Sequence, residues 1–219
     1  VLNQRHDNDD VSSTLIHILK CVKQLNPEFL NTPNGFKVET KLDFPKFWGL
    51  GSSSTLINNI AQWANIDAYK LLELTFGGSG YDIACAQYNY PLTYQLSVKS
   101  QEILHAVQND NRIIKQVDFN PEFKDCLYFV HLNKKQNSRE EIANFRSNKN
   151  NSELAVSEIS DITSKIINCK TLQDFDQLIS IHEQIISKTI KQRPVKERLF
   201  NDYTGTIKSL GAWGGDFVL

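Results

Sequence analysis

Three short glycine-rich turns divide the sequence and restrict how it can fold. They lie at Gly49–Ser54, Gly77–Asp82 and Gly211–Gly215. Because glycine adopts positive φ at little steric cost, each turn lets the backbone approach a ligand or another segment closely. The first two turns each precede an apolar run, and the third precedes Phe217. The sequence therefore predicts separate elements joined by tight turns, with no internal repeat.

Apolar spacing predicts helices and strands between these turns. Residues recur at helical spacing over 11–25, 56–64, 68–74, 152–167 and 172–190. Apolar or β-branched runs predict strands at 92–96, 112–117 and 126–132, with a strand start at Phe217. Helices and strands alternate without the regular order of a doubly wound sheet. The α+β class is therefore the expected fold class.

The clearest strand signal is an alternation over residues 36–44. One face would carry Phe36, Val38, Thr40, Leu42 and Phe44. The opposite face would carry Lys37, Glu39, Lys41 and Asp43. This period of two is typical of a half-buried strand.

Composition and charge exclude several classes of protein. The chain has 219 residues, 40% hydrophobic and 22% charged, with a net charge of -1. A near-neutral balance argues against a basic nucleic-acid binder, and the apolar content argues against disorder. No apolar run approaches the roughly 18 residues of a membrane span. Four scattered cysteines predict buried, reduced thiols and a cytoplasmic location: Cys21, Cys85, Cys126 and Cys169.

The first turn is a candidate phosphate-binding loop. It contributes Gly49, Leu50, Gly51, Ser52, Ser53 and Ser54 between a predicted strand and a predicted helix. The first N–H groups of a helix and serine hydroxyls can bind an anion, and two glycines allow close approach. The Gly-Lys-Ser/Thr ending of a Walker A loop is absent. The alternative is an ordinary glycine turn with a serine N-cap.

Each of the other two turns has one chemical and one structural interpretation. Gly78, Ser79 and Gly80 precede Asp82, whose carboxylate could accept a proton from a substrate hydroxyl. Alternatively, Asp82 caps a helix that starts at Ile83. The third turn offers another close backbone approach, or is a simple hairpin turn, through Gly211, Ala212, Gly214 and Gly215.

Taken in order, the three turns resemble the motifs of the GHMP kinases, which include galactokinase, homoserine kinase, mevalonate kinase and phosphomevalonate kinase. Gly49-Leu50-Gly51-Ser52-Ser53 is similar to the Gly-Leu-Gly-Ser-Ser-Ala phosphate loop. Gly78-Ser79-Gly80-Tyr81-Asp82 is similar to the Gly-Ser-Gly-x-Asp segment of the mevalonate and phosphomevalonate kinases. Gly211-Ala212-Trp213-Gly214-Gly215 resembles the third motif, Gly-Ala-Gly-Gly-Gly.

The resemblance implies a fold and a reaction. It implies a ribosomal-S5-like N-terminal domain over 1–119 and a ferredoxin-like C-terminal domain over 120–219, with ATP and Mg²⁺ bound. The γ-phosphoryl group would pass to a hydroxyl or phosphate of a small, mevalonate-like acceptor. Asp82 would be catalytic, and Ser53 and Glu73 would bind the metal. Acceptor contacts would come from Lys134, Lys135 and Arg139, which otherwise form a solvated charge run.

Several departures from the family pattern leave other functions open. Ser54 replaces an alanine, and Trp213 and Asp216 stand in place of glycines. The family's first motif is absent and the sequence has no methionine, which indicates an incomplete chain lacking its first strands and its last strand. A nucleotide-binding or regulatory relative without turnover is one alternative. A helix-rich interaction protein using residues 152–190 is another, and a homodimer is possible under any of them.

Overall fold

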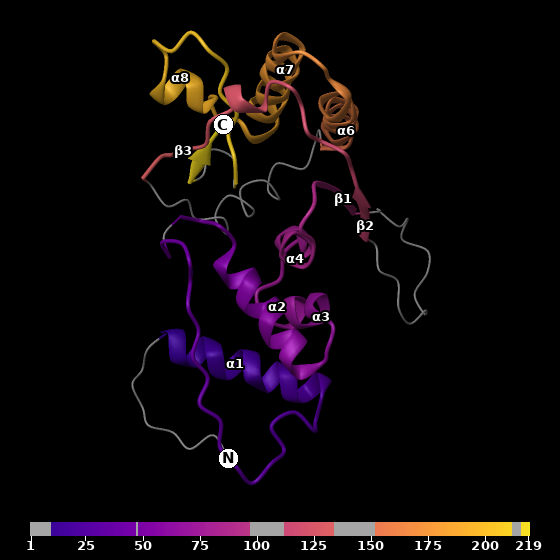
Figure 1. Cartoon of the computed structure of the whole chain (residues 1–219), viewed down its shortest axis with the longest axis vertical. Helices are drawn as coiled ribbons and strands as arrows, with labels where there is room; N and C mark the ends of the chain where they lie inside the picture. The colour runs from indigo at the N-terminus through magenta and orange to yellow at the C-terminus, as the bar shows by residue number, and fades with distance from the viewer. Residues whose placement is uncertain (1–9, 47, 97–111, 134–151, 212–215) are drawn as a thin grey trace. The chain divides into compact units, whose positions relative to one another are not determined.

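The computed structural model describes residues 10–46, 48–96, 112–133, 152–211 and 216–219 (Figure 1). It contains helices and two small antiparallel sheets, so the expected α+β class is confirmed. The chain forms two compact units. The first comprises residues 1–41 and 51–116, and the second comprises residues 42–50 and 117–219. Within the described residues, no helix combines the length and the apolar character needed to cross a membrane.

The first unit is mainly helical. Its elements are α1 (Asp10–Leu25), α2 (Ser52–Ala64), α3 (Ala68–Leu74), α4 (Tyr81–Gln87), β1 (Leu92–Leu96) and β2 (Arg112–Gln116). The two strands pair antiparallel, with Tyr94 opposite Ile114. Apolar faces of the four helices enclose one core, whose largest completely buried side chains are Ile18, Val22, Ile57, Leu71 and Ile83.

Local hydrogen bonds and one cation–π contact set the arrangement around α3. Asp67 caps the helix, since its carboxylate accepts from the N–H groups of Tyr69 and Lys70 at 2.7 and 3.2 Å. From β2, the Arg112 guanidinium lies 4.0 Å from the centre of the Tyr69 ring. The β1–β2 hairpin is thereby held against α3.

The second unit contains longer helices and very short strands. Its elements are a 3₁₀ helix, η1 (Lys124–Cys126), then β3 (Val130–His131), α6 (Ser152–Asn168), α7 (Leu172–Ile190), α8 (Val195–Leu199) and β4 (Phe217–Val218). β3 pairs with β4, with His131 opposite Phe217. One apolar cluster forms around Phe123, Phe175 and Ile179, and another forms around Val195, Ile207 and Val218.

A buried ionic cluster joins α7 to the segment before β4. The Ser209 hydroxyl donates to Glu183 Oε2 at 2.7 Å, and Lys208 Nζ lies 3.9 Å from Glu183 Oε1. His182 Nδ1 lies 3.6 Å from the same Oε1 atom. Burial of the Lys208 ammonium lowers its pKa, although the Glu183 charge opposes that effect. The Glu183 carboxylate is therefore surrounded by polar groups of His182, Lys208 and Ser209.

The sequence predicted most helices correctly and two strands incorrectly. Residues 68–74, 92–96 and 172–190 have the predicted type and bounds. The half-buried strand over 36–44 is wrong: no described strand pairs with it, and Phe36 and Val38 are 56% and 59% exposed. The buried strand over 126–132 shrinks to β3, because Tyr128 and Phe129 are more than two-thirds exposed.

The structure also corrects the description of the cysteines. All four are free, as expected, but burial is not shared by all of them. Cys21 is buried in the core of the first unit, whereas Cys85 and Cys126 are exposed. Although Cys85 and Cys126 lie in apolar runs of the sequence, their own side chains are not buried.

Candidate functional site

The first glycine turn leads directly into α2. Gly49 and Gly51 both have left-handed φ, 68° and 70°. Gly51 is the N-cap of α2, and its carbonyl accepts the N–H of Thr55 at 2.9 Å. The N–H groups of Ser52–Ser54 precede this first helical bond, which leaves them at the helix end where anions bind. Of the structural alternative, the serine N-cap is wrong, because the cap is a glycine without a side-chain bond, whereas the glycine turn itself is present.

Gly49 is closely approached from within the second unit. A Cβ atom at Gly49 would lie 1.7 Å from Oδ2 of Asp216, so no other residue fits without movement. Asp216 is one of the departures from the third family motif. Of the third turn itself, Gly211 has a φ of 67°, and an added Cβ there would meet no atom of the described residues within 4 Å, while residues 212–215 lie outside the described part of the chain.

Contacts from neighbouring elements hold the C-terminal end of the second glycine turn in place. Gly80 is the left-handed N-cap of α4, with φ 83°. A Cβ there would lie 2.8 Å from Cδ1 of Tyr69. The Tyr94 hydroxyl donates to the carbonyl of Ser79, and the N–H of Tyr81 donates to the Ser79 hydroxyl at 3.3 Å. Side chains from α3 and β1 therefore fix where α4 begins.

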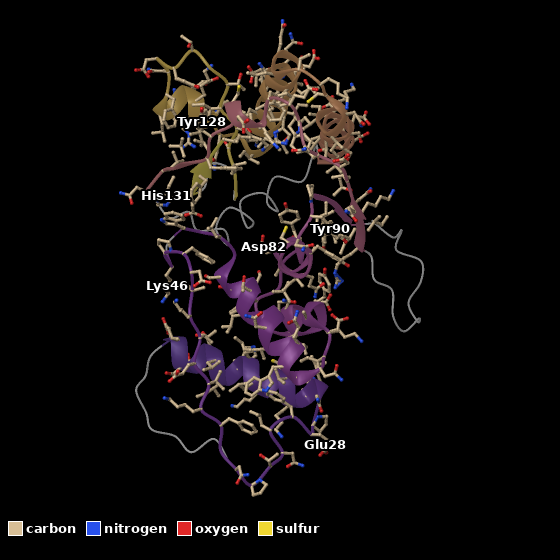
Figure 2. All side chains as sticks on the ribbon, in the orientation of Figure 1. Glu28, Lys46, Asp82, Tyr90, Tyr128 and His131 are labelled. Atoms are coloured by element: carbon tan, nitrogen blue, oxygen red, sulfur yellow. The ribbon has the colours of Figure 1, made fainter. Side chains whose placement is uncertain are left out.

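Asp82 lies in the first turn of α4 and is not its cap. The helix begins at Tyr81, one residue earlier than the capping alternative requires, so that alternative is wrong. The carboxyl group instead lies against the first glycine turn: a Cβ at Gly51 would be 3.6 Å from Asp82 Cγ and 3.7 Å from Oδ2. Figure 2 labels Asp82 on α4. The structure thus brings together Gly51 and Asp82, which the sequence assigned to two separate motifs.

Asp82 is exposed, yet its surroundings shift the protonation equilibrium of its carboxyl group. Although the residue keeps contact with solvent, partial burial raises the pKa of its carboxyl group above the ordinary 3.8. Hydrogen bonds from the α2 amides would lower that pKa instead. Burial also raises the pKa of the adjacent Tyr81 to about 12, with further contributions from Cys85 and Asp82. A carboxylate with a raised pKa is a stronger proton acceptor.

A buried side-chain hydrogen bond ties the two helices of the site together. Gln87 Nε2 donates to Asn58 Oδ1 at 3.1 Å, and Asn58 is only 2% exposed. Because a buried amide without a partner is costly, this bond fixes α4 against α2. Sequence reasoning missed both residues. The available signal was a single asparagine within the apolar face of α2.

The expected metal ligand Glu73 makes a different contact. Its carboxylate pairs with Arg112 at 3.5 Å and stays two-thirds exposed. Among the described residues, no group of three His, Cys, Asp or Glu side chains could hold a metal ion. Ser53, the other expected ligand, is exposed at the start of α2. The expected acceptor contacts Lys134, Lys135 and Arg139 lie outside the described residues.

Comparison with known proteins adds no relative: no model of a protein family, no curated protein and no solved structure matches the chain.

Proposed function

We propose that this chain is an ATP-dependent kinase that transfers the γ-phosphoryl group to a hydroxyl of a small, mevalonate-like acceptor. The observation that carries the proposal is the position of the Asp82 carboxyl group beside Gly51, at the start of α2. It joins a helix N-terminus suited to phosphate with a carboxyl group of raised pKa. The order of the three glycine-rich turns, which resembles that of the GHMP kinase motifs, also supports it.

The residues at the start of α2 fit a phosphate chain. Ser52, Ser53 and Ser54 offer N–H and hydroxyl groups, and the first turn of α2 carries no acidic residue that would repel an anion. Gly51 has no side chain to fill the space beside Asp82. Mg²⁺ would neutralise phosphate charge, with the exposed Ser53 hydroxyl as one ligand. Glu73 fits this role only if its ion pair with Arg112 opens.

The proposed step needs little covalent chemistry from the protein. The acceptor hydroxyl loses its proton to the Asp82 carboxylate as its oxygen attacks the γ-phosphorus of ATP. The bond to the bridging β,γ-oxygen breaks, and that oxygen leaves with ADP. Positioning and charge neutralisation supply most of the rate in such transfers. The Asn58–Gln87 bond supports positioning, because it holds α4 against α2.

The finer architecture and the location belong to the same proposal. The first unit would correspond to the ribosomal-S5-like domain and the second to the ferredoxin-like domain, in a cytoplasmic enzyme. Gly78–Gly80 would then face the acceptor.

One observation favours a second candidate, a nucleotide-binding relative that does not turn over. Glu73, the expected second metal ligand, is paired with Arg112. A protein that binds the nucleotide without its full set of metal ligands would keep its affinity for the nucleotide but transfer the phosphoryl group more slowly. Turnover by the unmodified chain separates the two candidates.

The test is the substitution Asp82→Asn. ATP affinity, measured by titration calorimetry, should stay within about threefold, whereas ADP release with acceptor should fall by about 10²–10⁴-fold. Mevalonate, phosphomevalonate, galactose and homoserine would be compared as acceptors. Asp67→Asn, a cap exchange of the same chemistry away from the site, serves as the control. Nucleotide binding without ADP release in the unmodified chain would support the second candidate, and no nucleotide binding would refute both.

A further inference from the structure

Two side chains that can bind a metal ion lie one helical turn apart on α1. His17 and Cys21 are four positions apart in the helix, so their side chains share one face of it. The Nε2 atom of the imidazole lies 3.9 Å from the Sγ atom of the thiol. Cys21 belongs to the buried core of the first unit and is only 7% exposed, whereas His17 is exposed. Solvent therefore reaches the pair from the imidazole side.

The end of α3 supplies a third donor atom. The carbonyl oxygen of Leu74 lies 3.2 Å from His17 Nε2 and 3.6 Å from Cys21 Sγ. The nearby carbonyl of Leu72 accepts the N–H of Gly77 at 2.7 Å, but in the described part of the chain no backbone N–H reaches the Leu74 carbonyl. It is one of the last carbonyls of a helix, which need partners from elsewhere. One nitrogen, one sulfur and one oxygen thus converge from two helices.

The separations of these three atoms match one face of a zinc coordination tetrahedron. Zinc binds nitrogen, sulfur and oxygen at about 2.05, 2.3 and 2.1 Å, so tetrahedral angles put N and S about 3.6 Å apart, S and O about 3.6 Å, and N and O about 3.4 Å. The observed separations are 3.9, 3.6 and 3.2 Å. An ion can therefore contact all three atoms after shifts of less than about 0.4 Å, with water as its fourth ligand.

We propose that His17, Cys21 and the carbonyl of Leu74 bind one Zn²⁺ ion. On binding, the thiol releases its proton to solvent and the neutral imidazole carries its proton on Nδ1, so that the sulfur and Nε2 both offer a lone pair. Without the ion, Nε2 and the thiol both donate hydrogen bonds to the same carbonyl. The third ligand is a backbone atom, so the site differs from the groups of three ligand side chains, none of which occurs among the described residues.

The ligand types distinguish this site from the magnesium of the proposed kinase reaction. Thiolate and imidazole suit Zn²⁺, whereas Mg²⁺ prefers oxygen ligands. A carbonyl is a weaker ligand than a carboxylate, so the affinity should be lower than that of a zinc site built from four Cys and His side chains. The bound ion would join α1 to α3 and stabilise the first unit. The proposal is independent of the kinase function.

Cobalt(II), a spectroscopic substitute for zinc, tests the proposal with the unmodified, reduced chain. Co²⁺ should occupy a single site, give a thiolate-to-cobalt charge-transfer band and the visible bands of tetrahedral cobalt, and be displaced by Zn²⁺. His17→Asn and Cys21→Ala should each weaken Zn²⁺ binding, measured by competition with a chelating dye, by at least about tenfold. Cys21→Ala should also remove the charge-transfer band. Cys126→Ser, which removes an exposed thiol of the second unit, is the matched control and should change neither result.

Thermal unfolding gives a second measurement. Zn²⁺ should raise the unfolding midpoint of the unmodified chain, because it binds the folded state, and this rise should be absent in His17→Asn. His17 is exposed, so its substitution leaves the fold intact even if Cys21→Ala is destabilised.

Three results would overturn the proposal. If the unmodified chain binds neither ion, the three groups form hydrogen bonds only. If binding is unchanged in His17→Asn, or the charge-transfer band survives in Cys21→Ala, the ion lies at another site. None of these measurements uses nucleotide or acceptor, so their failure is distinguishable from failure of the kinase proposal.

Discussion

At the scale of single residues, Gly49 and Gly51 share a backbone conformation but differ in their surroundings. Their φ values are 68° and 70°. An added Cβ at Gly51 makes only ordinary contacts, whereas one at Gly49 collides with the Asp216 carboxylate. Gly35 has neither a positive φ nor any atom within 4 Å of an added Cβ. Comparing substitutions at the three positions therefore separates the cost of a left-handed φ from the cost of a steric collision.

Alanine at these glycines should give graded losses of stability. Gly35→Ala should change the free energy of unfolding by less than about 0.5 kcal/mol, because neither cost applies. Gly51→Ala should lose about 1–2 kcal/mol for its left-handed φ. Gly49→Ala should lose clearly more, and adding Asp216→Ala should restore part of the difference. Denaturant titrations measure all four, and equal losses at Gly49 and Gly51 would contradict the collision with Asp216.

Glu183 should make stability depend on pH. Burial alone would raise the pKa of this carboxyl group, but His182, Ser209 and Lys208 together lower it below the ordinary 4.5. A lowered carboxyl pKa stabilises the fold above the unfolded-state value, and that contribution disappears as the pH falls through the folded-state value. Glu183→Gln should therefore lose about 1–3 kcal/mol at pH 7.

The difference between Glu183→Gln and the unmodified chain should shrink as the pH falls below about 4.5. Thermal unfolding between pH 3 and pH 8 measures it. Glu197→Gln, at an exposed position of α8, is the control and should show no such trend. A difference that stays constant over this range would show that Glu183 acts through packing and not through its charge.

At the scale of elements, helix starts follow local chemistry that the sequence displays. Asp67 caps α3, because its carboxylate accepts hydrogen bonds from two backbone N–H groups. Thr171 caps α7 by accepting the N–H of Asp174 at 3.1 Å, and its hydroxyl donates to the Asp174 carboxylate at 2.7 Å. Both helices were predicted with correct bounds, because the apolar periodicity lies within each helix and its capping residue directly precedes it.

Loss of the α3 cap should cost a measurable part of the stability of the first unit. Asp67→Ala should lower the free energy of unfolding by about 0.5–2 kcal/mol, since two N–H groups lose their acceptor. Asp67→Asn should keep most of that stability, because asparagine is an equally good N-cap. Urea titration measures both variants, and equal losses would mean that the negative charge matters more than the cap.

Strands were predicted less well, for a physical reason. Alternation over 36–44 describes the residues correctly but contains no information about a partner strand, and among the described residues no strand pairs with this segment. The β1 and β2 strands formed because each has the other within the same unit. The five-residue helix α8 was missed because so short a segment shows barely one helical period.

In the candidate site, too, local features could be predicted from the sequence and contacts between elements could not. Its turns and Asp82 could be located in the sequence, because glycine and carboxylate chemistry is local. The contact between Gly51 and Asp82 could not, since it depends on how α2, α3 and α4 pack. The same packing determines the Asn58–Gln87 bond. The pairing of Glu73 with Arg112 arises from the β1–β2 hairpin and could not be expected from spacing along the chain.

At the scale of the whole molecule, each unit has its own apolar core. Leu71 is completely buried in the first unit, and Ile179 is 2% exposed in the second. The two residues belong to clusters that share no member. A unit with its own core can unfold as a unit.

Calorimetry should therefore resolve two unfolding transitions. Leu71→Ala should lower one transition and Ile179→Ala the other, each by the equivalent of about 2–5 kcal/mol. The double variant should show both shifts, nearly additively. If either single variant moved both transitions together, the units would unfold as one cooperative body.

The aromatic contacts give each unit an optical signal. Trp63 packs edge-on against Phe29 and Phe36, at ring separations of 4.8 and 6.1 Å, in the first unit. Trp48 contacts His131 and Phe217 in the second, at 5.5 and 5.6 Å. The third tryptophan of the chain is Trp213, so replacing it together with one of these two by phenylalanine leaves a single indole whose emission follows a single unit. Trp63 also packs against Phe36, a half-exposed residue outside the helices, so its emission would report any displacement of that residue as well as the unfolding of the unit.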